Sequence, residues 1–241
     1  MSGPDRAEAR RAELAGHLEQ LQKRIADACA AAGRDPAETT LIAVTKTWPA
    51  SDVRLLHELG LADFGENRDQ EAAAKAAELA GQPITWHFVG QVQTNKAASV
   101  ARYADVIHSV DRMRLVRALG AAARRQARVL TCLIQVDLDP VYAHAGRGGV
   151  PPGQVRALAE AVAGEEGLVL GGVMAVAPMV LPAAHAFAGL APAAAAVRSV
   201  RPEAAMVSAG MSGDLEAAVA AGATHLRIGT ALLGDRRPTV M

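Results

Sequence analysis

Short apolar runs alternate with longer amphipathic segments along almost the whole chain. Such runs are typical of strands that are buried on both faces, as in a parallel sheet covered by helices. We predict strands over residues 40–46, 63–67, 84–90, 105–110, 129–138, 168–176, 206–212 and 225–229. Alanine-rich helices are predicted between them, over residues 51–59, 70–79, 95–103, 112–128, 153–163 and 213–221. This alternation implies right-handed crossovers and a parallel sheet.

The number of predicted strands favours an α/β fold made of a single (β/α)8 TIM-type barrel. A doubly wound open sheet is the alternative, but it more typically has about five or six strands. Residues 5–32 precede the first strand and predict an extra N-terminal helix, because Leu14, Leu18, Leu21 and Ile25 recur every three or four residues. Residues 182–202 predict a helix with irregular ends. No linker or change of composition divides the chain, so we expect residues 1–241 to form one domain.

The composition argues against several classes of protein. Basic and acidic side chains balance at 25 each, so no global field favours nucleic acid or an anionic membrane. The N-terminus is polar and charged, unlike a signal peptide, and no apolar run approaches the roughly 18 residues of a membrane span. Cys29 and Cys132 fall in apolar patterns, which indicates buried thiols in a reducing compartment. We expect a cytoplasmic protein.

Lys46 ends the first predicted strand, in the run Thr40-Leu-Ile-Ala-Val-Thr-Lys-Thr-Trp-Pro49. A lysine at the carboxyl end of a barrel strand lies where barrel enzymes place their active sites. An amine in an apolar setting can lose its proton near neutral pH and form a Schiff base with an aldehyde. From the strand alone, a lysine that only extends into solvent is the alternative.

Two glycine-bearing turns follow the last two predicted strands. The first contains Ser212, Gly213 and Asp214 at the start of a predicted helix, and the second contains Gly229 and Thr230. Either could be ordinary turn chemistry. In a (β/α)8 barrel, however, the loops after strands seven and eight commonly bind phosphate, so together the turns favour a phosphate-bearing ligand.

A lysine and a phosphate site on neighbouring strands are what pyridoxal 5'-phosphate (PLP) requires. Arg227 lies on the last predicted strand, where it could contact the pyridine nitrogen. Arginine stays protonated and cannot donate a full proton, so the ring nitrogen would remain neutral. A neutral ring is a weaker electron sink than a pyridinium, so we expect such a site to support only modest chemistry.

Several motifs in family order resemble the pyridoxal phosphate homeostasis proteins, the YggS/PROSC group, which share the barrel of alanine racemase. They are Ala43-Val-Thr-Lys-Thr47, Asp63-Phe-Gly-Glu-Asn67, Trp86-His-Phe-Val-Gly-Gln-Val-Gln-Thr-Asn-Lys96, His108-Ser-Val-Asp111, Gly172-Val-Met174, Ser208-Ala-Gly-Met-Ser212 and Leu226-Arg-Ile-Gly-Thr230. The resemblance implies PLP as the cofactor and a role in intracellular PLP homeostasis, by buffering or delivery, with little or no catalytic turnover.

The same resemblance implies a role for each matching residue. Lys46 would carry the cofactor, Arg227 would face the pyridine nitrogen, and Asn67 would lie near the ring hydroxyl. Met174 would lie against the ring, while the phosphate would be bound by Ser212, Gly229 and Thr230. The remaining cofactor-binding residues implied by the motif after strand seven are Ser208, Gly210 and Met211.

Two departures bear on function. Gly146-Arg-Gly-Gly149 stands where the family usually carries a lysine before a glycine, which leaves the role of Arg147 open. Alanine racemases also have a second, β-rich domain with a catalytic tyrosine, which this chain does not match; its own tyrosines are Tyr103 and Tyr142. We therefore expect a monomeric PLP carrier whose partners are PLP-dependent apoenzymes. The alternatives are a small PLP-dependent racemase or lyase, and a barrel enzyme that forms an aldolase-type Schiff base with a phosphorylated metabolite.

Other polar residues have simpler interpretations. His87 and His108 lie on predicted strands and are expected to be hydrogen-bonded core histidines, since no metal-binding spacing accompanies them. Trp86 is expected in the core. Glu66 could be an acid/base residue or a cap of the following helix. Lys96 could touch substrate or receive the cofactor in transit, or simply be solvated.

Overall fold

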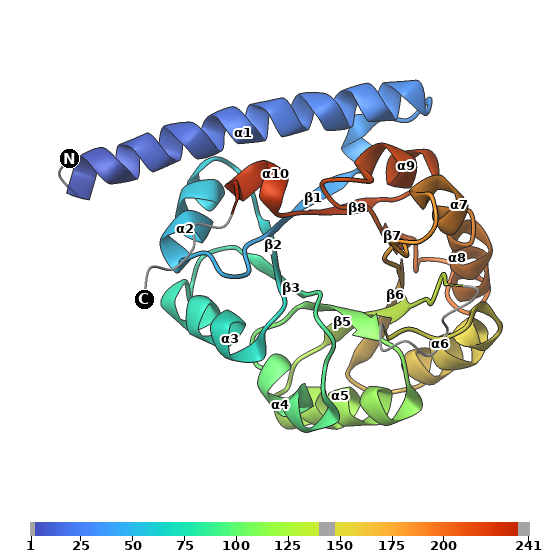
Figure 1. The fold of residues 1–241 in the computed structure, drawn as a ribbon. Helices are drawn as coiled ribbons and strands as arrows, with labels where there is room; N and C mark the ends of the chain where they lie inside the picture. Colours follow the sequence, from blue (N-terminus) through green and yellow to red (C-terminus); the bar gives the residue numbers. More distant parts are fainter. Residues whose placement is uncertain (1–2, 140–147, 236–241) are drawn as a thin grey trace.

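The structure, a computed structural model, describes residues 3–139 and 148–235. Its strands form a closed parallel barrel in which each strand pairs with the next in chain order and β8 returns to β1 (Figure 1). The strands are β1 (Thr40–Val44), β2 (Asp63–Glu66), β3 (Thr85–Phe88), β4 (Val106–Val110), β5 (Leu130–Gln135), β6 (Leu168–Met174), β7 (Met206–Ser208) and β8 (His225–Ile228). The predicted (β/α)8 barrel is confirmed, and the open sheet is excluded.

Helices surround the ring of strands (Figure 1). They are α1 (Gly3–Ala31), α2 (Ala50–Glu58), α3 (Asp69–Glu78), α4 (Ala97–Val100), α5 (Met113–Arg125), α6 (Val155–Ala163), α7 (Ala183–Phe187), α8 (Leu190–Arg198), α9 (Leu215–Ala220) and α10 (Thr230–Leu233). Three short 3-10 helices complete the described elements: η1 (Pro36–Glu38), η2 (Thr94–Lys96) and η3 (Pro152–Gln154). Among the described helices, none combines the length and apolarity that crossing a bilayer requires.

Two predicted helices differ from the observed ones. Residues 95–103 form a single α-helical turn, α4, because both of its flanks use tighter hydrogen bonds, such as Arg102 N to Ser99 O, before the chain enters β4. Residues 182–202 split into α7 and α8, with Gly189 at the junction. A side chain at Gly189 would lie 3.0 Å from Leu138, so the chain passes close to the segment after β5 there.

The predicted N-terminal helix is confirmed as α1, which lies across the outside of the barrel over α9 and α10 (Figure 1). The apolar stripe predicted from the sequence, Leu14, Leu18, Leu21 and Ile25, is buried. Burial of each such side chain contributes about 1.5–3 kcal/mol, so the stripe explains why the helix packs on the barrel instead of extending into solvent.

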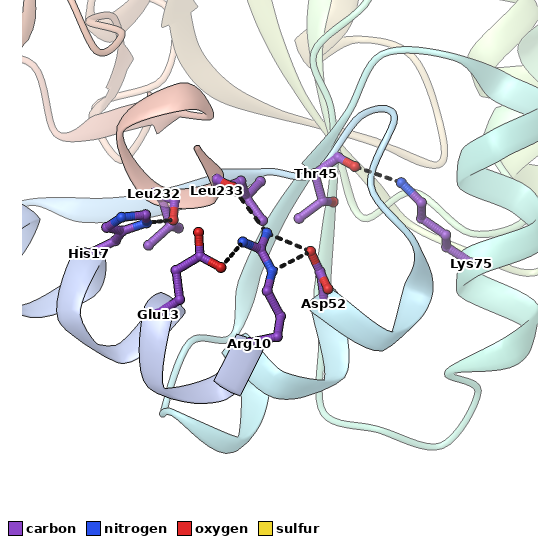
Figure 2. Close-up of polar contacts among 8 residues, drawn as sticks. All are labelled: Arg10, Glu13, His17, Thr45, Asp52, Lys75, Leu232 and Leu233. Carbon is purple, nitrogen blue, oxygen red and sulfur yellow. Dashed lines mark hydrogen bonds and ion pairs between the residues drawn. The ribbon is translucent and has the colours of Figure 1, made fainter. Parts of the chain in front are cut away.

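Polar contacts then fix where α1 lies. The guanidinium of Arg10 donates to Asp52 of α2 at 2.8 Å and 3.2 Å and to the carbonyl of Leu233 at 3.0 Å (Figure 2). His17 Nδ1 lies 3.0 Å from the carbonyl of Leu232. Because these carbonyls belong to the last turn of α10, α1 holds the short helix that begins with Thr230.

The apolar core has two parts. The larger lies between the strands and the helices, and includes the buried thiols of Cys29 and Cys132, as predicted. The smaller is a separate cluster of Val106, Leu133 and Met174. The barrel also contains a chain of hydrogen-bonded polar side chains from β2, β3, β4, β7 and β8, which leads to the candidate site.

Candidate functional site

A cavity of about 380 Å³ opens at the carboxyl ends of the strands, within the range of about 300–1,000 Å³ usual for small-molecule sites. This is the end of a barrel at which active sites occur. Its described lining consists of Val44, Lys46, Asn67, Val89, Met174, Val176, Met211, Ser212, Gly213, Arg227, Gly229 and Thr230.

The structure brings most of the predicted site residues together in this cavity, from five separate strand ends. Two do not line it: Ser208 is buried behind Arg227, and Gly210 lies in the turn after β7. Sequence reasoning missed the apolar wall of Val44, Val89 and Val176. Its one available signal was position, since all three lie at or just after the end of a strand.

Lys46 is two residues beyond β1 and half-buried at the cavity wall. Within the described part of the chain, its ammonium group has no hydrogen-bond or ion-pair partner. Lys75 differs, because its Nζ donates to three oxygens within 2.7 Å. Lys96 pairs with Asp69 at 3.7 Å and lines a neighbouring cavity. Of these three lysines, Lys46 is therefore the one available for a ligand.

Arg227 lies on β8 with 5% of its surface exposed. Its guanidinium donates to Ser208 Oγ at 2.7 Å and to the carbonyl of Ala175 at 2.8 Å. Burial lowers the pKa of Arg227 to about 10, opposed by the attraction of Asp214. The side chain therefore still carries its positive charge at neutral pH, beside a half-buried lysine.

Behind Arg227, a buried hydrogen-bonded chain extends through the barrel. His108 Nδ1 lies 2.9 Å from Ser208 Oγ, His108 Nε2 lies 2.9 Å from His87 Nδ1, and His87 Nε2 lies 2.9 Å from Asp63 Oδ1. Arginine can only donate, so Ser208 accepts from it and donates its own proton to His108. Each histidine is then neutral with its proton on Nε2, and the chain ends on the acceptor-only carboxylate of Asp63.

The lowered pKa of His108 agrees with this assignment. Burial keeps the pKa of His108 well below its ordinary value, and the nearby His87 and Arg227 lower it further. Burial likewise lowers the pKa of His225, whose ring lies 6.5 Å from that of His87, to about 4. The prediction of hydrogen-bonded core histidines at His87 and His108 is confirmed. Across residues 3–139 and 148–235, no cluster of His, Cys, Asp or Glu is arranged to hold a metal ion.

The two turns predicted to bind phosphate lie against each other. The backbone N–H of Ala231 donates to Ser212 Oγ at 3.2 Å, which joins the turn after β7 to α10. Gly210 makes this geometry possible, because it has φ +90° and an added Cβ would lie 2.6 Å from the Cβ of Ala218. Its carbonyl accepts from the N–H of Arg227 at 2.9 Å. Gly210 therefore supports the site indirectly, because it lets the turn pack against Ala218 and its carbonyl holds the backbone of Arg227.

Asn67 follows β2 and lines the same cavity as Ser212, Gly229 and Thr230. It packs directly on Gly90, where an added Cβ would lie 2.3 Å from both its carbonyl and its side-chain oxygen. Ser109 Oγ donates to the carbonyl of Gly90 at 2.5 Å, which holds that backbone in place. The position of Asn67 at the rim therefore depends on a residue without a side chain.

The remaining predictions have mixed outcomes. Trp86 is buried, as predicted. The capping role considered for Glu66 is wrong, because Arg68 stands at the N-cap of α3 and Glu66 is buried against Lys75. Glu66 is also absent from the described lining of the cavity, where an acid/base residue would lie. Tyr142 and Arg147 fall outside the described residues.

A larger cavity of about 560 Å³ lies between α1 and the start of α2. Three of its charged side chains pair with one another: Arg10 binds Glu13 and Asp52, and its guanidinium stacks over Trp48 at 4.6 Å. This cavity thus contains two carboxylates, whereas the described lining of the smaller cavity has none and includes a lysine without a partner among the described residues.

Comparisons with known proteins agree with this geometry. Residues 16–237 match the family described as "Alanine racemase, N-terminal domain". The chain is 41% identical over 244 residues to the pyridoxal phosphate homeostasis protein of Mycobacterium tuberculosis, covering 95% of each. It is 35% identical to PipY of Synechococcus elongatus, solved with PLP bound, with a TM-score of 0.78 over 92% of this chain and 100% of that one. An alanine racemase of Clostridium difficile is 13% identical, with a TM-score of 0.71 over 95% of this chain and 58% of that chain, and shows a shared fold.

The lowered histidine pKa values predict how stability depends on pH. Folded His108 and His225 stay neutral below pH 6.5, whereas the unfolded chain binds protons there, so the free energy of unfolding falls as the pH decreases. The contribution of His225 continues to fall until about pH 4. Each histidine costs up to about 1.4 kcal/mol per pH unit in this window. Denaturant titrations at pH 7.5, 6.0 and 5.0 measure the slope.

Two variants serve as the comparison. His225→Gln should give a shallower pH dependence than the wild type, while His185→Gln, at an exposed position on α7, should leave the slope unchanged. Equal slopes for the wild type and His225→Gln would contradict the assignment of a neutral buried histidine.

Proposed function

Since the chain belongs to the pyridoxal phosphate homeostasis protein family, with the barrel of the alanine racemase N-terminal domain, we propose that it binds PLP in the cavity beside Lys46. We propose further that it holds PLP as a Schiff base on Lys46 and releases it to other proteins. The observation that carries the proposal is the meeting of Lys46, Arg227, Ser212 and Thr230 in one cavity.

The residues present fit PLP group by group. The hydroxyls of Ser212 and Thr230, beside the bare backbone of Gly229, suit a phosphate. Met174 and the valines provide an apolar wall for a flat ring. Both charged side chains among the described lining residues are cations, Lys46 and Arg227, which complements an anionic ligand. No carboxylate in the described lining would repel the phosphate.

Each residue has a defined part in holding the cofactor. PLP, when bound, would supply an aldehyde carbon to which the uncharged amine of Lys46 would bond; the one water lost would take its oxygen from the aldehyde and its hydrogens from the amine. Ser212 and Thr230 donate hydrogen bonds to the phosphate. Arg227 uses two of its five N–H groups on Ser208 and Ala175 in the described part of the chain, which leaves others for the pyridine nitrogen.

The same groups favour a carrier over a catalyst. Arg227 remains protonated, so beside a pyridine nitrogen it would donate a hydrogen bond without transferring a proton, and the ring would stay a weak electron sink. Racemisation also needs a base on each face of the substrate α-carbon. In the described lining, Lys46 is the only side chain able to act as such a base. Tyr103 lies elsewhere, near Asp69, and burial raises its pKa.

We propose that the cofactor passes from this site to PLP-dependent apoenzymes, and that the protein acts as a monomer consisting of one barrel domain. A reversible covalent bond to one lysine suits that role, because the bond can be reversed by water or by an incoming amine. Neither nucleic acid nor membrane has a place in this mechanism.

Borohydride reduction of the PLP-loaded protein should place the pyridoxyl group on Lys46. The reason is that its amine is free in the cavity, whereas the ammonium of Lys75 has three acceptors and Lys96 lies in a neighbouring cavity. Peptide mapping by mass spectrometry measures the site. Lys46→Ala should lose the visible absorbance of the bound cofactor.

The control is Lys96→Ala, which should keep the absorbance and the labelled peptide. Labelling mainly at Lys75 or Lys96, or undiminished visible absorbance in Lys46→Ala, would refute the assignment.

Carrier and catalyst are distinguished by exchange at the α-carbon. Alanine or serine incubated with the loaded protein in D₂O should incorporate negligible deuterium by NMR, because the second base is missing from the described lining and the electron sink is weak. The same sample should reactivate an apo-aminotransferase. Rapid deuterium incorporation with inversion would instead establish the racemase alternative and direct attention to Tyr142, outside the described residues.

A further inference from the structure

The loop that carries Lys46 is held from the side of α3 by a cluster of charged residues that does not line the cavity. We call Glu66, Glu71 and Lys75 the α3 cluster. Glu66 ends β2, whereas Glu71 and Lys75 lie one helical turn apart on α3. Lys75 and Glu66 expose only 5% and 1% of their surfaces, so an ammonium and a carboxylate are buried together between the barrel wall and the helix.

Lys75 is the centre of the cluster. Its Nζ donates to Glu66 Oε1 and Glu71 Oε1, each at 2.6 Å. It also donates to the backbone carbonyl of Thr45 at 2.7 Å, the contact drawn in Figure 2. An ammonium has three protons, and all three have acceptors here. One of the three acceptors is the main chain immediately before Lys46.

The carboxylates hold the same loop at two further points. Thr45 Oγ1 donates to Glu66 Oε1 at 2.6 Å. The backbone N–H of Thr47 donates to Glu71 Oε1 at 2.5 Å. The cluster is therefore hydrogen-bonded to the chain on both sides of Lys46, while Lys46 itself has no partner among the described residues.

The loop has a backbone conformation that needs such support. Thr47 has φ +70°, in the left-handed region that β-branched residues rarely adopt. A residue held there costs of order 1–3 kcal/mol and persists only where the surroundings determine it. The hydrogen bond from Thr47 to Glu71 and the two hydrogen bonds at Thr45 hold the loop in this conformation.

Packing alone does not account for the α3 cluster. Burial of paired charges is often no more favourable than an apolar replacement of similar volume. One oxygen of Glu66, Oε2, is also buried without a hydrogen-bond partner among the described residues, which adds a cost. Among the described residues, every hydrogen bond that a side chain of the cluster makes outside the cluster ends on Thr45 or Thr47.

We propose that the α3 cluster positions Lys46, so that Nζ is presented to the cavity at the angle needed for covalent attachment of PLP. The inference rests on the proposed function, and it makes Glu66, Glu71 and Lys75 positioning residues, since none of them lines the cofactor cavity. The cluster fixes the backbone before and after Lys46. Only rotation about the side-chain bonds of Lys46 can then change the position of its Nζ. Loss of the cluster should slow attachment without changing how the phosphate is held.

Glu71→Ala is the most suitable variant, because its side chain is 24% exposed and its removal frees the N–H of Thr47 while the buried Lys75–Glu66 pair remains. The rate of covalent attachment is followed by visible absorbance after mixing apoprotein with PLP. Binding of pyridoxine 5'-phosphate, which has no aldehyde, is measured by calorimetry. Glu71→Ala should attach PLP at least about tenfold more slowly, with pyridoxine 5'-phosphate affinity within about twofold of wild type.

Two further variants make the result specific. Glu71→Gln keeps an oxygen acceptor for Thr47 and should recover most of the attachment rate. Glu78→Ala removes a carboxylate from the same helix, where it pairs with Arg54 at 3.5 Å away from the loop, and should behave as wild type. A wild-type attachment rate in Glu71→Ala, or an equal loss of pyridoxine 5'-phosphate affinity, would overturn the inference. If wild-type protein bound pyridoxine 5'-phosphate but never attached PLP, the proposed function itself would fail.

Discussion

Arg227 carries its positive charge inside the barrel, and that charge determines which residues can surround it. A buried cation without compensation costs several kcal/mol, so each polar neighbour has to be an acceptor or be polarised toward one. Ser208 accepts a hydrogen bond from Arg227 and is linked by hydrogen bonds through His108 and His87 to Asp63, which exposes 27% of its side chain. The barrel interior consequently contains a polar chain beside a small apolar cluster, instead of layers of branched apolar residues alone.

The cavity is thus supported from two sides of the barrel wall. The histidine chain fixes Arg227 from the interior, while the α3 cluster holds the loop around Lys46 from the side of the helices. A third support comes from α1, whose Arg10 and His17 bind the last turn of α10 and so steady the helix that starts at Thr230. Lys46, Arg227 and the turn proposed to bind phosphate each have an anchor of their own, which is what preorganisation of a small ligand site requires.

The barrel could be predicted because each element has a local signal: apolar runs for the strands and a repeating stripe for α1. Most of the residues that line the candidate cavity could be predicted because motifs at strand ends match a family. The hydrogen-bond networks that support the site could not be predicted. His87, His108 and Ser208 are distant in sequence and meet only once the barrel closes. Glu71 and Lys75 resemble an ordinary surface pair at helical spacing, and the burial of Lys75 depends on contact with Thr45, thirty positions away. Glu66 could be interpreted from the sequence as an acid/base residue or a helix cap, because its burial against Lys75 exists only in the folded chain.

The central claim is that the cavity beside Lys46 and Arg227 is the PLP site, and a crystal structure of the protein with PLP tests it most directly. Electron density should be continuous from Lys46 Nζ to the cofactor, with the pyridine nitrogen at Arg227 and the phosphate at Ser212, Gly229 and Thr230. Cofactor density attached to a different lysine, or lying in the cavity beside Arg10 with the Lys46 cavity unchanged, would contradict the account.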